Sequence, residues 1–493
     1  MNLNMDKPLR RVTIFALLLI FALMVQVNYI QGSQAEKLQT HKLNNRQFLD
    51  VFKRPRGKIL AGGEVLVYSK QQPNSENYAR YYKDGEIFAP VTGFFNGGAS
   101  GIERAYHSLL DGRDKRITNQ RWFDQFIGKP AIGADVETTI IPNAQRRAYR
   151  ALAQANPNLR GAVVVMDVRT GAIVVMASYP SFDPNEVAPQ TGEKGAKRLV
   201  ELEGKPNDKG EVNERNKRLK PLVNNVLEDT FFPGSSFKSV IAAAALDNGL
   251  NKNSTVPAPS TYTLPGTNTQ LPNSHEGGAC GGAGQAPLIL TFAESCNTTY
   301  GILGAEQLGI DKVLETTKKF HYDQRIEVEP DLRTVPSKFP EMNQAETALA
   351  SIGQGNNTAT PLHMCLVAAA AANDGRIMKP YLVQRVRAAD QSVIEEADPQ
   401  ELSRAMSPGQ AEQLADMMRE VTRTGTARNV PQLAGKTGTA DFDGVEYNNR
   451  WFVGFAPADK PRYAFAVITQ GIGSGGEAAA PIAASVMREV LKK

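Results

Sequence analysis

The sequence predicts an α+β protein with more than one domain and one N-terminal membrane anchor. The chain has 493 residues, of which 41% are hydrophobic and 22% are charged, and these values are ordinary for a folded globular protein. Helical patterns lie before and after blocks of strand pattern instead of alternating with single strands, which favours α+β. The net charge of +5 is spread along the chain without long basic runs, so we expect no nucleic-acid partner.

The N-terminus contains the predicted anchor. Val12–Ile30 is a run of nineteen residues without a formal charge, close to the ~20 residues that a helix needs to cross a bilayer. Basic residues precede it, so the positive-inside bias predicts a cytoplasmic tail over 1–11, a single transmembrane helix over 12–30 and an exported body at the plasma membrane. A cleaved signal peptide is the alternative, with Ser33–Ala35 as the cleavage site, but the apolar run is longer than the usual h-region of about 7–15 residues.

Residues 31–137 are predicted to form a smaller, non-catalytic spacer domain. Short strand-like runs such as Glu64–Tyr68 are separated by glycine-rich turns, a pattern typical of short antiparallel strands. Ser75–Asn77 has a Ser-x-Asn spacing, but it lies in a polar segment and is predicted to be a turn.

Residues 138–493 are predicted to form the larger domain. A helix over Asn143–Ala155 is followed by a hairpin of two buried strands over 161–168 and 172–180. The charged segment 186–228 is predicted to be a surface insertion near the functional site, although a solvated loop without a role is an equal alternative. The later elements are two buried alanine-rich helices, two neighbouring core strands and a C-terminal helix, placed at 241–246, 368–372, 450–457, 463–469 and 481–493.

The first chemical motif is S-x-x-K at Ser235 and Lys238, which occurs once in the chain. Pro233-Gly234 makes a turn into an apolar helix, so the serine is expected at the helix N-terminus. Residues three apart share a helix face, so the lysine amine can reach the serine hydroxyl, and burial favours its neutral, basic form. Because a hydroxyl needs an adjacent base to become a nucleophile, this pair predicts nucleophilic catalysis.

The second motif is S-x-N at Ser295 and Asn297, sixty residues after the first. A hydroxyl and an amide two positions apart on a loop can both face one cleft. The hydroxyl can then relay a proton and the amide can bind a substrate amide. A helix cap is the structural alternative for this spacing.

The third motif is K-T-G-T over Lys436–Thr439, which leads into strand sequence. Such a strand presents N–H groups to an oxyanion and hydroxyls to a carboxylate, and Gly438 allows backbone and ligand to approach closely. Arg423–Thr426 ends in the same three residues, but it follows a predicted helix over Ala411–Val421. We therefore predict that this copy is a helix C-terminal turn and that Lys436–Thr439 is the functional motif.

The three motifs in this order resemble those of the penicillin-recognising serine transpeptidases. Nearly the whole chain resembles class B penicillin-binding proteins, and its start together with Ala89–Gly93 is similar to the penicillin-binding protein A family of actinobacteria. The resemblance implies an antiparallel sheet with flanking helices plus an all-helical part over 138–493, and a dimerisation-like domain over 31–137. The segments that carry it, besides the anchor and the motifs, are Lys7–Arg11, Arg56–Leu60, Gly101–Arg104, Leu109–Gly112 and Ser351–Gly355.

The same resemblance implies a D,D-transpeptidase that cross-links peptidoglycan stem peptides. It implies that Ser235 attacks the carbonyl of the penultimate D-alanine and that Lys238 takes its proton. Ser295 then relays a proton to the departing D-alanine, Asn297 holds the substrate amide, and Lys436 supplies positive charge. The acyl group passes to an acceptor amine.

The resemblance also implies how the substrate is bound and which partners the protein has. Thr437 and Thr439 bind the terminal carboxylate, with Gly438 between them, and the N–H groups of Ser235 and Thr439 form the oxyanion hole. β-Lactams acylate the same serine. No cofactor or metal is implied, and the expected partners are the membrane, divisome proteins and a separate glycosyltransferase, in cell division and cell-shape maintenance.

Three other functions compete with transpeptidation. A D,D-carboxypeptidase shares every motif and uses water as acceptor, and a β-lactam sensor or divisome scaffold need not turn over. A β-lactamase needs a glutamate that directs water at the ester. Glu329–Arg333 resembles that loop, but Arg333 stands where an asparagine is expected and the chain is almost twice as long as such an enzyme requires, so we interpret Glu329 as an ordinary solvated acid.

Cys280, Cys296 and Cys365 allow one disulfide at most. In an exported domain, the glycine-rich surroundings of Cys280 favour a bridge to Cys296, whereas Cys365 lies in an apolar run and is expected to be a buried free thiol. Three reduced thiols and a Cys280–Cys365 bridge are the alternatives. The five histidines have no paired metal-ligand spacing, so no metal site is expected.

Overall fold

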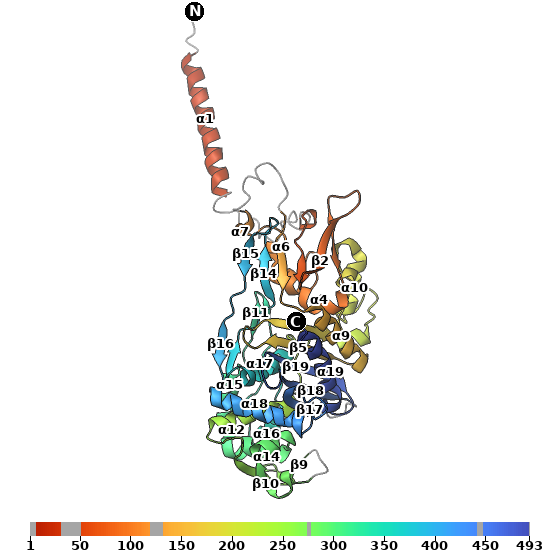
Figure 1. Cartoon of the computed structure of the whole chain (residues 1–493). Helices are drawn as coiled ribbons and strands as arrows, with labels where there is room; N and C mark the ends of the chain where they lie inside the picture. Colours follow the sequence, from red (N-terminus) through yellow and green to blue (C-terminus); the bar gives the residue numbers. More distant parts are fainter. Residues whose placement is uncertain (1–5, 31–50, 119–131, 274–277, 441–446, 493) are drawn as a thin grey trace, which may run out of the picture. The chain divides into compact units, whose positions relative to one another are not determined.

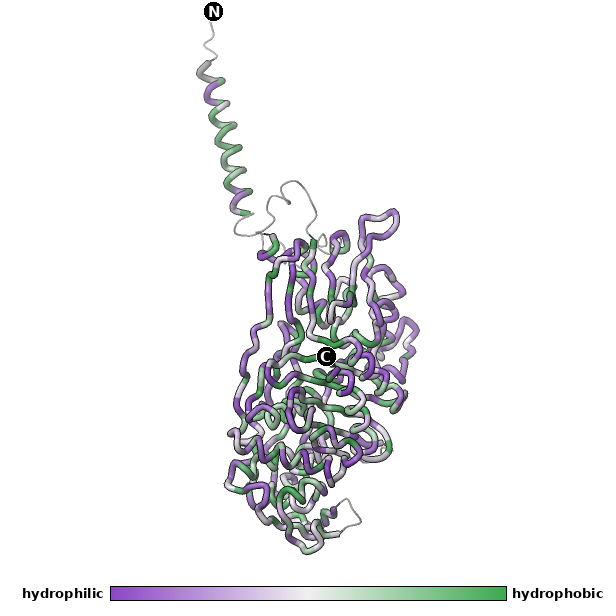
Figure 2. The backbone as a smooth tube through the Cα atoms, in the orientation of Figure 1, coloured by the Kyte–Doolittle hydropathy of each residue, from purple (hydrophilic) through white to green (hydrophobic). Residues whose placement is uncertain are grey.

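A computed structural model describes residues 6–30, 51–118, 132–273, 278–440 and 447–492. The N-terminal helix α1 (Asp6–Tyr29) and the compact unit Pro55–Lys493 are separate bodies. Within α1, Leu9–Tyr29 has a mean hydropathy of 2.2 and exposed apolar side chains, and it is long and apolar enough to cross a membrane; its green colour in Figure 2 follows this run. A single N-terminal span is thus supported, while its orientation stays a prediction, and Ser33–Ala35 lies outside the described residues.

The first sheet of the compact unit has six strands in the order β15-β14-β4-β1-β2-β3. Strands β15, β14 and β2 of this sheet are labelled in Figure 1. The predicted strand at 64–68 lies within β2, and β1 pairs in parallel with β4 and antiparallel with β2. Two strands of this sheet, β14 and β15, come from the second half of the chain. The sheet and its short helices are β1 (Ile59–Ala61), β2 (Glu64–Gln71), β3 (Tyr78–Tyr82), β4 (Asp135–Thr138), β14 (Val383–Arg387), β15 (Val393–Glu396), α4 (Gly85–Thr92), α5 (Gly101–Ala105), α6 (His107–Leu110) and α7 (Lys115–Thr118).

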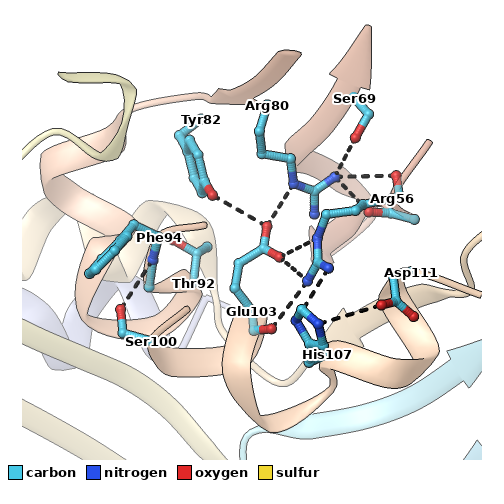
Figure 3. Close-up of polar contacts among 12 residues, drawn as sticks. Arg56, Ser69, Arg80, Tyr82, Thr92, Phe94, Ser100, Glu103, His107 and Asp111 are labelled. Atoms are coloured by element: carbon cyan, nitrogen blue, oxygen red, sulfur yellow. Dashed lines mark hydrogen bonds and ion pairs between the residues drawn. The ribbon is translucent and has the colours of Figure 1, made fainter. Parts of the chain in front are cut away.

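A buried network of charges lies between this sheet and its helices (Figure 3). The carboxylate of Glu103, on α5, accepts hydrogen bonds from Arg56 Nη2 and from Arg80 Nε, both at 2.6 Å. The Tyr82 hydroxyl donates to the same carboxylate at 3.3 Å. The three charged side chains are at most 2% exposed, so this is a paired and desolvated ion cluster in which the loss of one partner would leave a buried charge uncompensated.

The central sheet is antiparallel, with the strand order β17-β18-β19-β5-β6. It contains the predicted hairpin and the two predicted core strands, and β18 and β19 are adjacent. Helices α9 and α19 pack on each other and on the sheet, while α17 packs on β19, β5 and β18. These elements are β5 (Gly161–Asp167), β6 (Ile173–Tyr179), β17 (Ala434–Ala440), β18 (Asn448–Ala456), β19 (Tyr463–Gly471), α9 (Pro142–Ala155), α17 (Pro361–Ala372) and α19 (Gly475–Val490).

The C-terminal helix begins earlier than predicted. We expected it to start at Pro481, but α19 starts at Gly475 because Ser474 and Glu477 form a capping box that satisfies its first N–H groups. Pro481 is therefore inside the helix, on its exposed side.

The all-helical part packs beside the central sheet and carries the other walls of the site. Its elements, with the minor strands and turns, are η6 (Gly234–Phe237), α12 (Lys238–Asp247), β7 (Thr255–Ala258), β8 (Thr261–Thr263), β9 (Gln270–Pro272), η7 (Cys280–Gly282), β10 (Gly284–Pro287), α13 (Leu288–Ala293), α14 (Asn297–Ile302), η8 (Leu303–Leu308), α15 (Gly309–Lys319), α16 (Gln344–Ser351) and α18 (Pro408–Arg423). The remaining elements are η2 (Val51–Lys53), η4 (Pro184–Glu186), η5 (Pro189–Thr191), α10 (Glu193–Leu202), α11 (Glu214–Leu219), β11 (Glu327–Glu329), β12 (Leu332–Arg333), β13 (Arg376–Met378) and β16 (Glu401–Arg404).

Candidate active site

Ser235 lies in the turn η6, immediately before the buried helix α12. Its neighbour Ser236 is fully buried, and the Ser236 hydroxyl donates to the Pro233 carbonyl at 2.6 Å. Ser235 is partly exposed and lines a cavity. The structure therefore presents the first serine of the pair and uses the second to close the turn.

Lys238 is the first residue of α12 and is fully buried. Its amine donates to the Ser295 carbonyl at 2.7 Å and to Asn297 Oδ1 at 2.8 Å. The sequence placed this amine beside the Ser235 hydroxyl, but in the described residues its hydrogen bonds go to the S-x-N loop. The lysine thus ties the first motif to the second.

Ser295 stands between two lysines. Its Oγ lies 2.8 Å from Lys436 Nζ and 3.3 Å from Lys238 Nζ. The backbone of Ser295 has a φ of 62°, a left-handed conformation that is uncommon for a residue with a side chain. The loop between α13 and α14 holds this strained conformation, and strain of this kind is concentrated at functional sites.

The two lysines are buried beside aromatic rings. Lys238 Nζ lies 5.6 Å from the centre of the Tyr300 ring, and Lys436 Nζ lies 5.6 Å from that of Phe292. Burial, together with the charge of Lys436, lowers the pKa of Lys238 well below its usual value. Burial lowers the pKa of Lys436 to about 7. Lys436 is consequently poised to change protonation state near neutral pH, and burial favours the neutral form of Lys238.

Strand β17 packs against the turn η6, forms another wall of the site and carries the third motif. Thr437 and Thr439 line the cavity, whereas Lys436 lies buried behind them. At Gly438 we expected a close approach to ligand, but a Cβ there would lie 2.6 Å from the Pro233 carbonyl oxygen. Glycine is required at this position because β17 packs directly against the turn that presents Ser235.

The cavity has a volume of about 960 Å³. Five of the predicted site residues line it, which are Ser235, Ser295, Asn297, Thr437 and Thr439. The other lining residues are Glu294, Ile352, Gln354, Thr424, Gly425, Thr426, Arg428, Asn429, Asn448, Gly473, Ser474, Gly475, Gly476 and Glu477. The three motifs, separated by sixty residues or more in sequence, therefore meet at one cavity.

The segment Thr424–Thr426, which repeats the letters T-G-T, also lines this cavity. Helix α18 ends at Arg423, so the prediction of a helix C-terminal turn is correct. We predicted Lys436–Thr439 as the functional motif, and the structure adds that all three residues of the turn line the same cavity. The repeated letters T-G-T were the one sequence feature that could have indicated a role for this turn in the site. The turn and the K-T-G-T strand line the same cavity.

Two further expectations are corrected. Among the described residues, the cavity lining includes none from 186–228. That segment instead contacts the six-stranded sheet, where Gln190 Nε2 donates to the Arg80 carbonyl at 2.7 Å. Glu329 is not a solvated acid: it is buried and accepts the Tyr106 hydroxyl at 2.6 Å, and burial raises its pKa. It also lies outside the cavity lining, so it is not placed to direct water at Ser235.

The predicted disulfide is present. Cys280 and Cys296 are bonded with a Cα–Cα distance of 6.3 Å, and Cys365 is a buried free thiol. Glu294 lies beside the two bonded sulfurs in the one group of described residues whose spacing could suit a metal ion. Because both sulfurs are committed to the bridge, this group is a disulfide that joins η7 to the S-x-N loop.

Comparison with known proteins agrees with this geometry. Residues 161–488 match the family model of the penicillin binding protein transpeptidase domain, and residues 56–136 match that of the penicillin binding protein A dimerisation domain. The chain belongs to the penicillin-binding protein transpeptidase family. It is 34% identical to peptidoglycan D,D-transpeptidase PbpA of Mycolicibacterium smegmatis, over 99% of this chain and 100% of the relative.

More distant relatives and solved structures agree with this assignment. This penicillin-binding protein is 27% identical to peptidoglycan D,D-transpeptidase MrdA of Escherichia coli, over 85% of the chain and 67% of the relative. The structure of penicillin-binding protein A from M. tuberculosis as an imipenem acyl-enzyme complex matches with a TM-score of 0.82 and 33% identity. The match covers 90% of this chain and 100% of that one.

Proposed function

We propose that this membrane-anchored D,D-transpeptidase cross-links peptidoglycan by acylating Ser235 with a stem peptide and transferring the acyl group to an amine. The main support for this proposal is the position of the Ser295 hydroxyl, which lies between two buried lysines and lines the same cavity as Ser235. A nucleophile, a base and a proton relay are the three groups that this reaction requires.

Lys238 is proposed as the base. A neutral amine has two N–H donors, and these suit the two carbonyl oxygens at 2.7 and 2.8 Å, from Ser295 and Asn297. The remaining lone pair can then accept a hydroxyl proton. When the Ser235 oxygen bonds to the carbonyl carbon of the penultimate D-alanine, Lys238 takes the proton, and the bond to the terminal D-alanine nitrogen breaks.

Ser295 is proposed as the relay that returns a proton to the leaving nitrogen. Its Oγ can give its own proton to that nitrogen and receive one from the adjacent lysines. Lys436 in its charged form strengthens this transfer, because a cation at 2.8 Å makes the hydroxyl more acidic. In the second half of the reaction the same groups act in reverse on the acceptor amine.

The remaining predicted residues are proposed to bind the substrate. Thr437 and Thr439 bind the terminal carboxylate, and Asn297 contacts the peptide amide, consistent with their place in the cavity lining. The N–H groups of Ser235 and Thr439 are proposed to form the oxyanion hole. Gly438 supports this role, since it allows β17 to lie directly against the Ser235 turn.

The organisation of the chain completes the proposal. Residues 1–11 form the cytoplasmic tail and 12–30 the membrane span. Residues 31–137 form the spacer domain and 138–493 the exported catalytic domain. The basic residues before the apolar run support this orientation at the plasma membrane. A separate glycosyltransferase and divisome proteins are the proposed partners, and cell division and shape the proposed setting.

The test of the nucleophile is labelling by a fluorescent penicillin. The wild type should be labelled and Ser235→Ala should not. Ser236→Ala is the matched control, because its hydroxyl is buried in the turn and should not be needed for labelling. Label retained in Ser235→Ala would overturn the assignment. Incubation with a D-Ala-D-Ala stem peptide and an amine acceptor then separates a cross-linked product, expected here, from the hydrolysed product of a carboxypeptidase.

A further inference from the structure

The turn Thr424–Thr426 lines the cavity and contacts the S-x-N loop, the K-T-G-T strand and α19. A Cβ on Gly425 would lie 2.3 Å from the carbonyl oxygen of Ala293, at the end of α13 and two residues before Ser295. On its other side, a Cβ on Gly476 would lie 2.1 Å from the Thr426 carbonyl oxygen. The turn is therefore packed by direct backbone contact against the S-x-N loop and against the first turn of α19.

The side chain of Thr426 contacts the K-T-G-T strand. Its Oγ1 lies 2.5 Å from Oγ1 of Thr437, a distance that requires one hydroxyl to donate to the other. Thr437 is only 6% exposed, so few other partners are available to orient its hydroxyl. The rotamer and the proton of Thr437 are thus linked to those of Thr426.

The direction of this hydrogen bond matters for binding an anion. A hydroxyl has one proton, so Thr437 can donate to a carboxylate only if it is not donating to Thr426. In that state Thr426 must be the donor and Thr437 the acceptor. Each bond polarises the next, so a Thr426–Thr437–carboxylate chain binds more strongly than Thr437 alone.

We propose that Thr426 is a positioning residue that orients the Thr437 hydroxyl toward the carboxylate of the donor peptide or β-lactam. The proposal rests on the proposed function of Thr437. It assigns a role in substrate recognition to the second copy of T-G-T, which we predicted only as a helix C-terminal turn.

The experiment compares acylation by a penicillin with acylation by its methyl ester, which lacks the carboxylate charge. In the wild type the acid should react faster than the ester. Thr426→Val keeps the shape of the side chain but removes its hydroxyl, and it should lower the rate with the acid by about five- to tenfold, the worth of one hydrogen bond. The rate with the ester should change by less than about twofold. Thr426→Ser, which restores a donor, should recover most of the discrimination.

Thr422→Val is the matched control. Thr422 is buried in α18, the helix that precedes the turn, and its hydroxyl donates to the Leu433 carbonyl at 2.6 Å, but it does not line the cavity. Its loss should affect stability without changing the ratio of acid to ester. A Thr437→Val background should abolish the effect of Thr426→Val, since the two hydroxyls act in series.

The outcomes separate this proposal from the one on which it depends. If Thr426→Val slows acid and ester equally, or neither, Thr426 only supports the fold and the proposal fails while the role of Thr437 stands. If the wild type does not discriminate between acid and ester, carboxylate recognition by Thr437 fails as well. Label lost in Ser235→Ala shows that the nucleophile is correctly assigned in either case.

Discussion

Two clusters of buried cations in this molecule have opposite electrostatic designs. In the first, Arg56 and Arg80 share the carboxylate of Glu103 (Figure 3). In the second, Lys238 and Lys436 share the Ser295 hydroxyl, and the described residues record no carboxylate within salt-bridge distance of either amine. All five side chains are almost fully buried.

The difference determines what each cluster can do. Burial raises the pKa of Glu103, but the two guanidinium groups more than offset this and lower it. That network stays charged, and its contribution to stability is lost only as pH falls through the lowered pKa. The lysines have no such compensation, so burial lowers their pKa values. A paired cluster holds the fold, whereas an unpaired one exchanges protons.

The largest expected effect is on the acylation rate, when one lysine of the unpaired cluster, Lys238 and Lys436, is replaced by a residue that stays charged. Lys238→Arg places a group at the base position that does not release its proton at neutral pH. We expect the second-order rate of acylation by penicillin to fall by about 10³-fold, within the range for loss of a general base. Lys319→Arg, in an exposed ion pair, is the control. Acylation within a few-fold of the wild type would remove Lys238 from the role of base.

The next effect comes from breaking the paired cluster. Glu103→Gln leaves two buried guanidinium groups without their carboxylate, and we expect a loss of about 3–5 kcal/mol in the free energy of unfolding. Glu64→Gln removes the partner of the more exposed Lys83 and Arg146 and should cost about 1 kcal/mol or less. Thermal denaturation measures both. Equal melting temperatures for the two variants would contradict a structural role for the Glu103 network.

Sequence reasoning predicted the unpaired cluster better than the paired one. Spacing within a helix or strand is local, so Ser235, Lys238 and Lys436 could be assigned from their motifs. Arg56 and Glu103 were noticed only as parts of family-like segments. Their contact depends on packing between a sheet and a helix, which no local pattern contains.

The features that the sequence did not predict also depend on contacts between elements that are far apart in the chain. The turn at Thr426 was correctly predicted as a helix end, but its contact with Thr437 depends on how α18 and β17 pack. Glu329 was expected to be a solvated acid because the β-lactamase resemblance failed at Arg333, yet its carboxylate is buried and accepts hydrogen bonds from Tyr106 and from the N–H groups of Leu382 and Val383. The left-handed backbone of Ser295 is likewise imposed by the surrounding loop, because the residue type does not favour it.

A third prediction concerns the disulfide that joins η7 to the loop of Ser295. Closing a loop of about 15 residues contributes ~3 kcal/mol on the chain-entropy estimate. Reduction should also free the loop that holds Ser295 between the lysines. We therefore expect the acylation rate to fall even at temperatures at which the reduced protein is still folded. The measurement uses a Cys365→Ala background, in which Cys280 and Cys296 are the only cysteines. Two free thiols under non-reducing denaturation would rule out the bridge.

The smallest expected effect is in the pH dependence, and it tests the contrast directly. Lys436 has a pKa of about 7, so its charge is present below pH 7 and lost above it. If this charge assists Ser295, the acylation rate should decline by about fivefold between pH 7 and 8, because the charged fraction falls from about one half to about one tenth. Lys436→Arg stays charged, so the decline should disappear even if the rate at pH 7 is lower. A decline that persists in Lys436→Arg would assign it to another group.

Stability should move in the opposite direction over the same interval. In the unfolded chain Lys436 has an ordinary lysine pKa of about 10.4, so above pH 7 this residue binds more protons there than in the folded protein. By linkage, Lys436 makes the free energy of unfolding rise with pH between about 7 and 8, below the range in which the raised pKa of the buried Cys365 thiol opposes the rise. The Glu103 network contributes no slope there, because its lowered pKa lies below the range. If deprotonation of the lysine cluster causes the loss of activity above pH 7, the acylation rate should fall while the free energy of unfolding rises. If unfolding causes the loss, both quantities should fall together, and that result would contradict the proposed role of the lysines.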